Sequence, residues 1–219
     1  MRIKIFENPI IDYFTAWSVP KALSVTNVAN IYTSEDQKAL GDVIRQHAES
    51  PLSSPHQVSA SKTVTELYDG RIDATGTPFI YAVIGLSATG DYAKDRRNYI
   101  IFCLICFMLS LLILCRLLKF SFVSGALLIT FFVSAYAPVI ADVKIGNVNQ
   151  IQLFMLTLFI WLTAKSEHSL AAPVILGIGA MFKPTTAAVC LLSLLSPMIR
   201  KEYKILIRRI VGISIGAMC

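Results

Sequence analysis

The stretch YIIFCLICFMLSLLILCRLL, from Tyr99 to Leu118, decides the fold class. It is an unbroken apolar run of about 20 residues whose charged side chain, Arg116, lies close to its end. An α-helix rises about 1.5 Å per residue, so a helix of this length crosses a hydrocarbon core of about 30 Å. The stretch therefore predicts a transmembrane helix.

The composition of the whole chain is typical of a membrane protein. Of its 219 residues, 55% are hydrophobic and only 16% are charged, against about a quarter in soluble domains. Residues 1–98 mix acidic, basic, Ser and Pro residues like a segment that faces water. Residues 99–164, by contrast, carry four charged side chains, which are Arg116, Lys119, Asp142 and Lys144. We therefore expect a polar external loop, 1–98, joined to a transmembrane region, 99–219.

Further apolar stretches follow the first one. They cover about 122–140, 149–164, 170–198 and 205–219, and the last of these is too short to span a bilayer. The third carries Lys183-Pro184 near its middle, and proline both removes a backbone donor and disfavours helix in the residue before it. We therefore predict a helix broken into 170–182 and 185–198. The expected fold class is all-α, a partial polytopic membrane helix bundle.

Residues 1–98 are expected to carry amphipathic or interfacial helices. Asn8-Pro9 is a favourable helix start, with Asn as the cap and Pro at the first helical position, and Pro20 is expected to bend or end that helix. A second helix is predicted within 31–50, with Ser34 as its cap, followed by a Ser- and Pro-rich link. The apolar stretch from Pro78 is too short to span and suits an interfacial or re-entrant segment.

Basic residues bear on orientation and on partners. They gather at the ends of apolar stretches, above all in 200–209, which is typical of cytoplasmic loops and argues against nucleic-acid binding despite a net charge of +6. If this cluster is cytoplasmic, then 142–150 and Lys183 face outward with residues 1–98. Lys94, Arg96 and Arg97 favour the flipped orientation, so the charge count alone leaves both open.

Several short motifs follow one another in a recognisable order. They are DYFTAWSVPKAL from Asp12, NVANIY from Asn27, TPFIYAVIGLS from Thr77, GNVNQIQLFML from Gly146 and LGIGAMFKPTTAAVCLLSLL from Leu176. In this order they resemble glycosyltransferase family 87 (DUF2029), whose members are membrane enzymes of the GT-C type. The resemblance covers roughly residues 11–197.

The chain also departs from the family pattern. It has Asn147 where many relatives have Gln after the glycine, Thr77-Pro78-Phe79 in place of Tyr-Pro-Pro, and no glycine in NVANIY. The family's span before Asp12 and its later spans are missing as well. The resemblance therefore implies a fragment truncated at both ends, whose activity by itself is in doubt.

The resemblance implies a hexosyltransferase of the plasma (inner) membrane, a multi-pass protein of the cell envelope. Such an enzyme takes a mannose-like hexose from a polyprenyl-phosphate sugar, on the non-cytoplasmic face, and transfers it with inversion to a hydroxyl of a glycolipid or glycan acceptor. Asp12 matches the position of the family's general base. From its spacing alone, Asp12 is better explained as a first-turn acid that complements the helix dipole, and the resemblance is what favours a base.

The remaining candidate residues would bind the donor. The phosphate needs cations more than a general acid, and Lys183 is the first candidate because a charge inside an apolar stretch is expensive. Lys183 could instead snorkel to the interface, and the amides could serve as helix caps or brace the loop against Lys183. The further phosphate candidates are Lys144, Arg96 and Arg97, and the sugar or loop candidates are Gly146, Asn147, Asn149 and Gln150.

No metal or other cofactor is expected, because the sequence has no metal-type Cys/His pairing. Two other classes of function stay open. A transporter or flippase fragment would use the break at Lys183-Pro184 and the amides as a midplane substrate site. A non-catalytic membrane scaffold is the other alternative.

Overall fold

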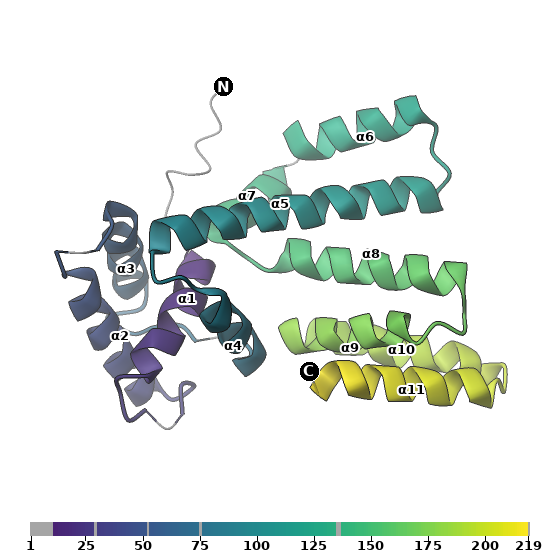
Figure 1. Ribbon diagram of the computed structural model, residues 1–219. Helices are drawn as coiled ribbons and strands as arrows, with labels where there is room; N and C mark the ends of the chain where they lie inside the picture. Colours follow the sequence, from purple (N-terminus) through teal and green to yellow (C-terminus); the bar gives the residue numbers. More distant parts are fainter. Residues whose placement is uncertain (1–10, 29, 52, 75, 135–136, 219) are drawn as a thin grey trace. The chain divides into compact units, whose positions relative to one another are not determined.

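The protein is described by a computed structural model, which places residues 11–28, 30–51, 53–74, 76–134 and 137–218 (Figure 1). Over these residues it is all-α, as predicted, with eleven helices and no strand. The helices are α1 (Ile11–Leu23), α2 (Ser34–Ala48), α3 (Pro55–Leu67), α4 (Pro78–Ser87), α5 (Tyr92–Leu117), α6 (Phe122–Ser134), α7 (Ala137–Ile145), α8 (Asn149–Lys165), α9 (Ala171–Phe182), α10 (Thr185–Ile199) and α11 (Tyr203–Met218).

The chain divides into two compact units. Unit 1 comprises residues 1–102 and 136–147, and unit 2 comprises 103–135 and 148–219. Helix α5 belongs to unit 1 up to Phe102 and to unit 2 from Cys103. The polar front predicted over 1–98 therefore corresponds to most of unit 1, to which α7 is added from later in the chain.

One described helix, α5, is long and apolar enough to span a membrane. A second candidate results only if α7 and α8, which a short break separates, are taken together as one span. The span predicted over 122–140 is replaced by α6, which ends at Ser134, and α7, which starts at Ala137. Neither helix alone is long enough to cross a hydrocarbon core, because each residue adds only about 1.5 Å.

The break predicted at Lys183-Pro184 is confirmed. Helix α9 ends at Phe182, Lys183 is extended with φ −146° and ψ 118°, and α10 begins at Thr185. An extended residue directly before proline is the expected conformation, because the proline ring disfavours helix there. The polar side chain of Lys183 thus lies at a junction between two apolar helices.

Unit 1 is built around α1, which contacts α2, α3, α4 and α7. The aromatic residues of α1 were expected at a membrane interface, but Phe14 is 1% exposed and Trp17 is 3% exposed. Tyr92, near the start of α5, contacts both rings, with centroid distances of 5.3 and 5.0 Å. These aromatic side chains therefore form the core of unit 1 instead of a surface anchor.

Local predictions for unit 1 need three corrections. Of the two outcomes expected at Pro20, an end of the helix is wrong, because α1 continues to Leu23, and Pro20 lies against Gly85 of α4. Helix α2 is capped by Thr33, whose hydroxyl accepts from the backbone N–H of Asp36, and not by Ser34. The link predicted after α2 is largely helix α3, which starts with Ser54 as its cap and Pro55 in its first turn. The predicted start at Asn8-Pro9 lies outside the described residues.

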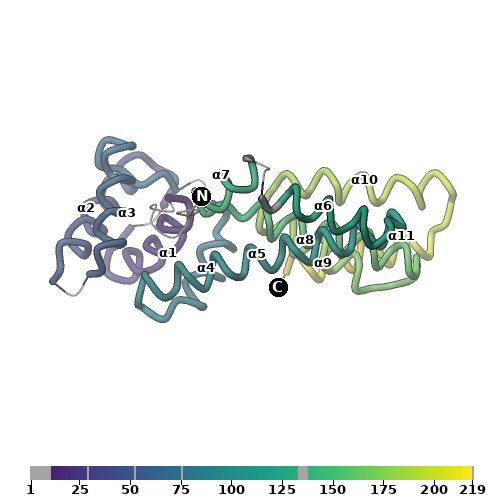
Figure 2. Tube along the Cα trace, turned by 90° about the horizontal axis from the view of Figure 1, so that it is seen from above, coloured from purple at the N-terminus to yellow at the C-terminus, as the bar shows by residue number. Residues whose placement is uncertain are grey.

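Unit 2 is held together by close contact between helix backbones. Helices α9 and α11 pack directly against each other, and α8 and α10 pack against α9 (Figure 2). A Cβ atom on Gly216 would lie 2.1 Å from the carbonyl oxygen of Val174, and one on Gly177 would lie 2.3 Å from that of Ile213. The two helices can approach this closely only because glycine has no side chain, as is typical of helix pairs in membranes.

The cysteines of unit 2 agree with the prediction that they act as small apolar residues. Cys103, Cys106 and Cys190 are buried, Cys115 is partly buried, and all four are free thiols. Cys190 belongs to the apolar core around Leu176. These residues therefore fill space between helices.

Candidate functional site

Asp12 lies in the first turn of α1, in unit 1, and its side chain is exposed. Its carboxylate acts on two tyrosines from other parts of the unit. Burial raises the pKa of Tyr68, and the carboxylates of Asp73 and Asp12 raise it further. Burial likewise raises the pKa of Tyr81 to about 12, with further contributions from Tyr32, Asp73 and Asp12. Two carboxylates and a group of phenols therefore share one region of unit 1.

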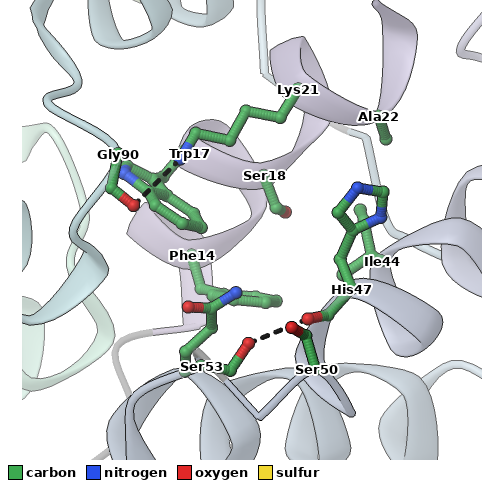
Figure 3. Close-up of a pocket in the computed structure, with 11 residues that line it drawn as sticks. Phe14, Trp17, Ser18, Lys21, Ala22, Ile44, His47, Ser50, Ser53 and Gly90 are labelled. Atoms are coloured by element: carbon green, nitrogen blue, oxygen red, sulfur yellow. Dashed lines mark hydrogen bonds between the residues drawn. The ribbon is translucent and has the colours of Figure 1, made fainter. Parts of the chain in front are cut away.

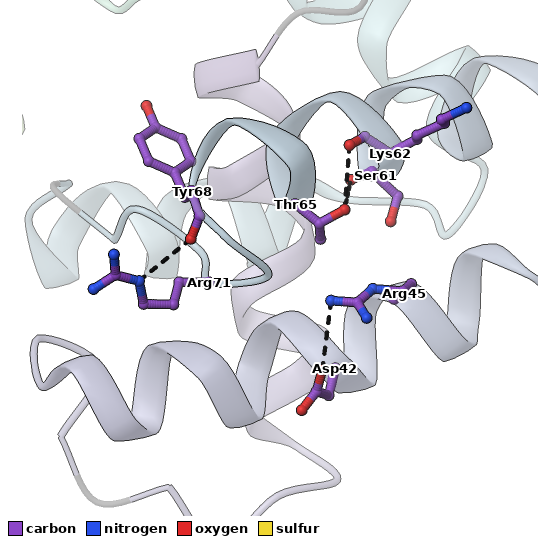
Figure 4. Close-up of polar contacts among 7 residues, drawn as sticks. All are labelled: Asp42, Arg45, Ser61, Lys62, Thr65, Tyr68 and Arg71. Carbon is purple, nitrogen blue, oxygen red and sulfur yellow. Dashed lines mark hydrogen bonds and ion pairs between the residues drawn. The ribbon is translucent and has the colours of Figure 1, made fainter.

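Tyr68 lies at the end of α3, beside the turn that follows it. The charge of Asp73 favours the protonated form of the Tyr68 phenol. Its backbone carbonyl accepts from Nε of Arg71 at 3.3 Å (Figure 4). The turn itself contains Asp69 and Gly70, both with positive φ, of 51° and 81°. This turn reverses the chain after α3 and brings Asp73 back toward the tyrosine.

Tyr81 is fixed by the loop before α4. Its hydroxyl accepts a hydrogen bond from the backbone N–H of Gly76 at 3.0 Å. The Tyr32 hydroxyl donates to the carbonyl of the same glycine, also at 3.0 Å. A Cβ on Gly76 would lie 3.0 Å from the Tyr81 ring, so a glycine suits this close approach. Thr77 then caps α4, its hydroxyl accepting from the N–H of Ile80.

Unit 2 contains a second polar cluster at the break between α9 and α10. The ammonium of Lys183 donates a hydrogen bond to Oδ1 of Asn149. The side-chain amide of Gln152 donates to the hydroxyls of Thr185 and Thr186, at 3.1 and 2.8 Å. The contacts of Asn149 with Lys183 and of Gln152 with Thr186 each span 34 positions of the sequence. They join the first turn of α8 to the junction of α9 and α10. The contact between Asn149 and Lys183 matches one of the alternatives predicted from the sequence, in which the amides brace the loop against Lys183.

Gln150 differs from its neighbours because it is buried. It is 3% exposed, and its Oε1 has no hydrogen-bond partner among the described residues. A buried amide oxygen without a partner is unfavourable by about 1–3 kcal/mol. Gln150 therefore points into the protein and is not an exposed ligand for a sugar hydroxyl.

Gly146 and its neighbours end α7 in unit 1. Gly146 has φ +81°, and its N–H and that of Asn147 donate to the carbonyl of Asp142 at 2.9 and 3.1 Å. This arrangement is a glycine C-cap, in which the left-handed residue satisfies the last carbonyls of a helix. The carbonyl of Gly146 accepts from the hydroxyl of Tyr99 at 2.9 Å. Gly146 and Asn147 therefore terminate a helix, and Lys144, partly buried, lies in its last turn.

The two arginines at the start of α5 have opposite environments. Arg96 is 3% exposed, whereas Arg97 is exposed. Next to Arg96, the carboxylate of Asp95 accepts from Nε1 of Trp17 at 3.0 Å. It also accepts from the N–H and hydroxyl of Thr89, at 2.9 and 2.7 Å. Arg97 is thus the more accessible of the two phosphate candidates.

The structure brings together some of the predicted residues and adds others. Asn149 and Lys183 are in contact in unit 2, and Asp12 lies in unit 1. Asp73 and the tyrosines near Asp12 were missed because no motif or helical spacing connects them; the loops before α2 and α4 and the turn after α3 bring them together. No group of three or more His, Cys, Asp or Glu suited to a metal ion occurs among the described residues.

Comparisons with models of protein families, with curated proteins and with solved structures find no match to this chain.

Proposed function

We propose that this protein is part of a membrane glycosyltransferase of the GT-C type. It would move a mannose-like hexose from a polyprenyl-phosphate sugar to a hydroxyl of a glycolipid or glycan, on the non-cytoplasmic face of the membrane. The observation that carries the proposal is the exposed carboxylate of Asp12, whose charge acts, together with that of Asp73, on the phenols of Tyr68 and Tyr81. Carboxylates and phenols are the groups that bind and deprotonate hydroxyls.

In the proposed reaction Asp12 is the general base. An acceptor hydroxyl oxygen attacks the anomeric carbon, its proton passes to the Asp12 carboxylate, and the bond from that carbon to the phosphate oxygen breaks. The products are an inverted glycoside and a polyprenyl phosphate. Asp73 would orient the acceptor together with Tyr68, whose raised pKa keeps its hydroxyl protonated and able to donate.

Cations would stabilise the phosphate as it leaves. Lys183, in unit 2, stays a predicted phosphate ligand, and its hydrogen bond with Asn149 would hold its ammonium in place at the junction of α9 and α10. Arg97, exposed, and Lys144, partly buried, are the further candidates. Gln152 and Thr186 would support the junction because their side chains join α8 to α10.

The base assignment is tested with Asp12→Asn in the full-length protein. Membranes that contain the protein are given a polyprenyl phosphate with a labelled hexose, and label in lipid-linked and glycan products is counted. We expect transfer to fall by about 10²-fold or more, the usual contribution of a general base. Asp69→Asn is the matched control, because Asp69 is exposed and asparagine also tolerates its positive φ. Transfer equal to wild type in Asp12→Asn would overturn the assignment.

The broken helix at Lys183 favours a second candidate, a transporter or flippase. A transporter would move a labelled lipid-linked sugar across vesicles without forming a new glycoside. It would depend on Lys183 but not on Asp12. Movement of label that is lost in Lys183→Met and kept in Asp12→Asn, with no glycoside formed, would support transport in place of transfer.

A further inference from the structure

Unit 1 contains a cavity of about 250 Å³ that the proposed transfer chemistry does not use. It lies among α1, α2 and the start of α3 (Figure 3). Apolar and aromatic side chains form part of its wall, and polar side chains enter it from several directions. The residues that matter here are Phe14, Trp17, Ser18, Lys21, His47 and Gln57.

The cavity faces away from Asp12. Successive residues of a helix are rotated by about 100°, so Phe14, Trp17 and Lys21 share one face of α1. Asp12 precedes Phe14 by two positions and Lys21 by nine, and it therefore lies on roughly the opposite face. The cavity is thus separate from the place where Asp12 would act as a base.

The charge in this cavity is the ammonium of Lys21. Its Nζ lies 3.4 Å from the centre of the Trp17 ring and donates to the carbonyl of Gly90 at 3.4 Å. Lys21 forms no ion pair with any described residue. The carboxylate that acts on it, Asp95, is occupied by its hydrogen bonds with Trp17, Thr89 and Gly90. Burial lowers the pKa of Lys21, so an anion in the cavity would stabilise the charged form.

The rest of the polar lining supplies uncharged groups. Nδ1 of His47 lies 3.0 Å from the carbonyl of Val43, which can only accept, so that nitrogen carries the proton. Nε2 of the uncharged ring can then only accept a hydrogen bond, as from the hydroxyl of a singly protonated phosphate. The side-chain amide of Gln57 is a donor in the lining, and the hydroxyl of Ser18, which donates to the carbonyl of Thr15 at 3.4 Å, offers its oxygen as an acceptor. None of the described lining residues is Asp or Glu. A carboxylate has two coplanar oxygens, whereas a phosphate offers oxygens in several directions, which matches donors on different walls.

We propose that this cavity binds the phosphate group of a small phosphorylated ligand, with Lys21 as its cation and Ser18, His47 and Gln57 around it. The aromatic wall of Phe14 and Trp17 would contact the organic part of the ligand. The phosphate can come from a soluble sugar phosphate or from the headgroup of a polyprenyl phosphate. Both present the same phosphate group to Lys21. Titration with a soluble and with a lipid phosphate ester distinguishes the two sources.

The structure provides its own reporter for this test. The chain has two tryptophans, so Trp161→Phe leaves Trp17, whose ring carries the Lys21 ammonium, as the single indole. The full chain in detergent is titrated with glucose 1-phosphate, inorganic phosphate and farnesyl phosphate at constant ionic strength. Farnesol and glucose serve as the uncharged controls. Tryptophan fluorescence is expected to change saturably, because a phosphate draws the ammonium off the ring.

Lys21→Met then removes the charge and keeps the length of the side chain. Because this variant has no ammonium on the Trp17 ring, its binding and that of its parent are compared by isothermal titration calorimetry. We expect its affinity for the phosphate ligands to fall by about tenfold or more, the usual effect of losing a charge-assisted hydrogen bond. Lys62→Met, at an exposed lysine of α3, is the matched control and should bind like the parent. Thermal unfolding of each variant checks that it is folded.

Binding of farnesyl phosphate alone would assign the site to lipid headgroups, and binding of glucose 1-phosphate alone would assign it to soluble esters. The absence of a saturable change with every phosphate ligand would overturn the proposal, and so would equal binding of farnesol and farnesyl phosphate. Equal affinity in folded Lys21→Met and in its parent would overturn the role of the lysine. None of these outcomes depends on sugar transfer by Asp12.

Discussion

The two units of this chain are stabilised in different ways. Unit 1 has side chains that contact across its helices, such as the aromatic group around Tyr92 and the buried Asp95 with its hydrogen bonds from two other segments. Unit 2 has α9 and α11 in backbone contact through glycines, and large apolar side chains such as Leu191 and Ile199 remain exposed at 68% and 75%. A polar network suits a unit surrounded by water, whereas small residues inside and apolar residues outside suit contact with lipid.

This difference can be measured because each unit has one tryptophan, Trp17 in unit 1 and Trp161 in unit 2. A variant that retains one of them reports on one unit during unfolding in detergent and denaturant. In these two single-tryptophan backgrounds, the effect of a further substitution can be followed in the unit that contains it.

The largest effect is expected from Asp95→Ala. Four donors, from Trp17, Thr89 and Gly90, would lose their charged acceptor, and Asp95 is only 5% exposed. We expect the free energy of unfolding reported by Trp17 to fall by about 3–5 kcal/mol, as when one partner of a buried charged group is removed. Asp42→Ala, at an exposed position, should change it by less than about 1 kcal/mol. A loss of similar size in both variants would contradict the importance of the network.

The next largest effect is expected from Gly216→Ala in unit 2. The new Cβ would lie 2.1 Å from the carbonyl oxygen of Val174, so α9 and α11 must move apart. Overpacking of this kind destabilises by about 1–3 kcal/mol, and the loss should be reported by Trp161. Gly125→Ala is the same change where the nearest neighbour is 3.5 Å away, and it should be neutral or stabilising because alanine favours helix. Equal effects of the two substitutions would show that the close contact is absent.

A smaller effect is expected from the contact between Lys183 and Asn149. Lys183→Met, Asn149→Ala and the double variant form a cycle that isolates the energy of their interaction. We expect a coupling of about 1 kcal/mol in the unfolding reported by Trp161, in the range for a hydrogen bond to a charged group that is only partly buried. Additive effects would mean that the amide does not hold the lysine.

The smallest effect at neutral pH is expected from Tyr81→Phe, and this effect changes at high pH. Burial raises its pKa from about 10 in the unfolded chain to about 12 in the folded protein. Its contribution to stability is therefore complete below about pH 10 and is lost as the pH rises toward 12. Tyr81→Phe should be slightly less stable at neutral pH, because it loses the hydrogen bond from Gly76, and should show a weaker decline of stability between these two pH values. Denaturant unfolding at each pH, followed through Trp17, measures both effects.

Local sequence features predicted part of this structure correctly. The apolar run from Tyr99 indicated the helix that became α5, although α5 begins at Tyr92, and Lys183-Pro184 indicated the break between α9 and α10. The start of α5 was missed because its polar first turns belong to unit 1 and do not resemble a membrane span. The two helices α6 and α7 were predicted as one span because the apolar composition continues across the join.

The candidate site was predicted unevenly for a related reason. Lys183 and the amides stand out in the sequence because polar side chains are costly inside apolar segments. Asp73, Tyr68 and Tyr81 lie in a polar segment, where such residues are common and carry no comparable signal. The first helix of residues 1–98 was predicted to be interfacial, whereas its Trp17 is buried, because aromatic residues have the same helical spacing whether they face lipid or a protein core.

The sequence by itself determined the all-α class, the apolar stretches and the position of the helix break, because composition and proline act over a few neighbouring residues. Only the tertiary structure decided which side chains meet. Trp17 and Asp95 are 78 positions apart, and Asn149 and Lys183 are 34 apart. Such pairs depend on how helices pack, and packing depends on the shapes of whole helix faces, which no single stretch of sequence contains.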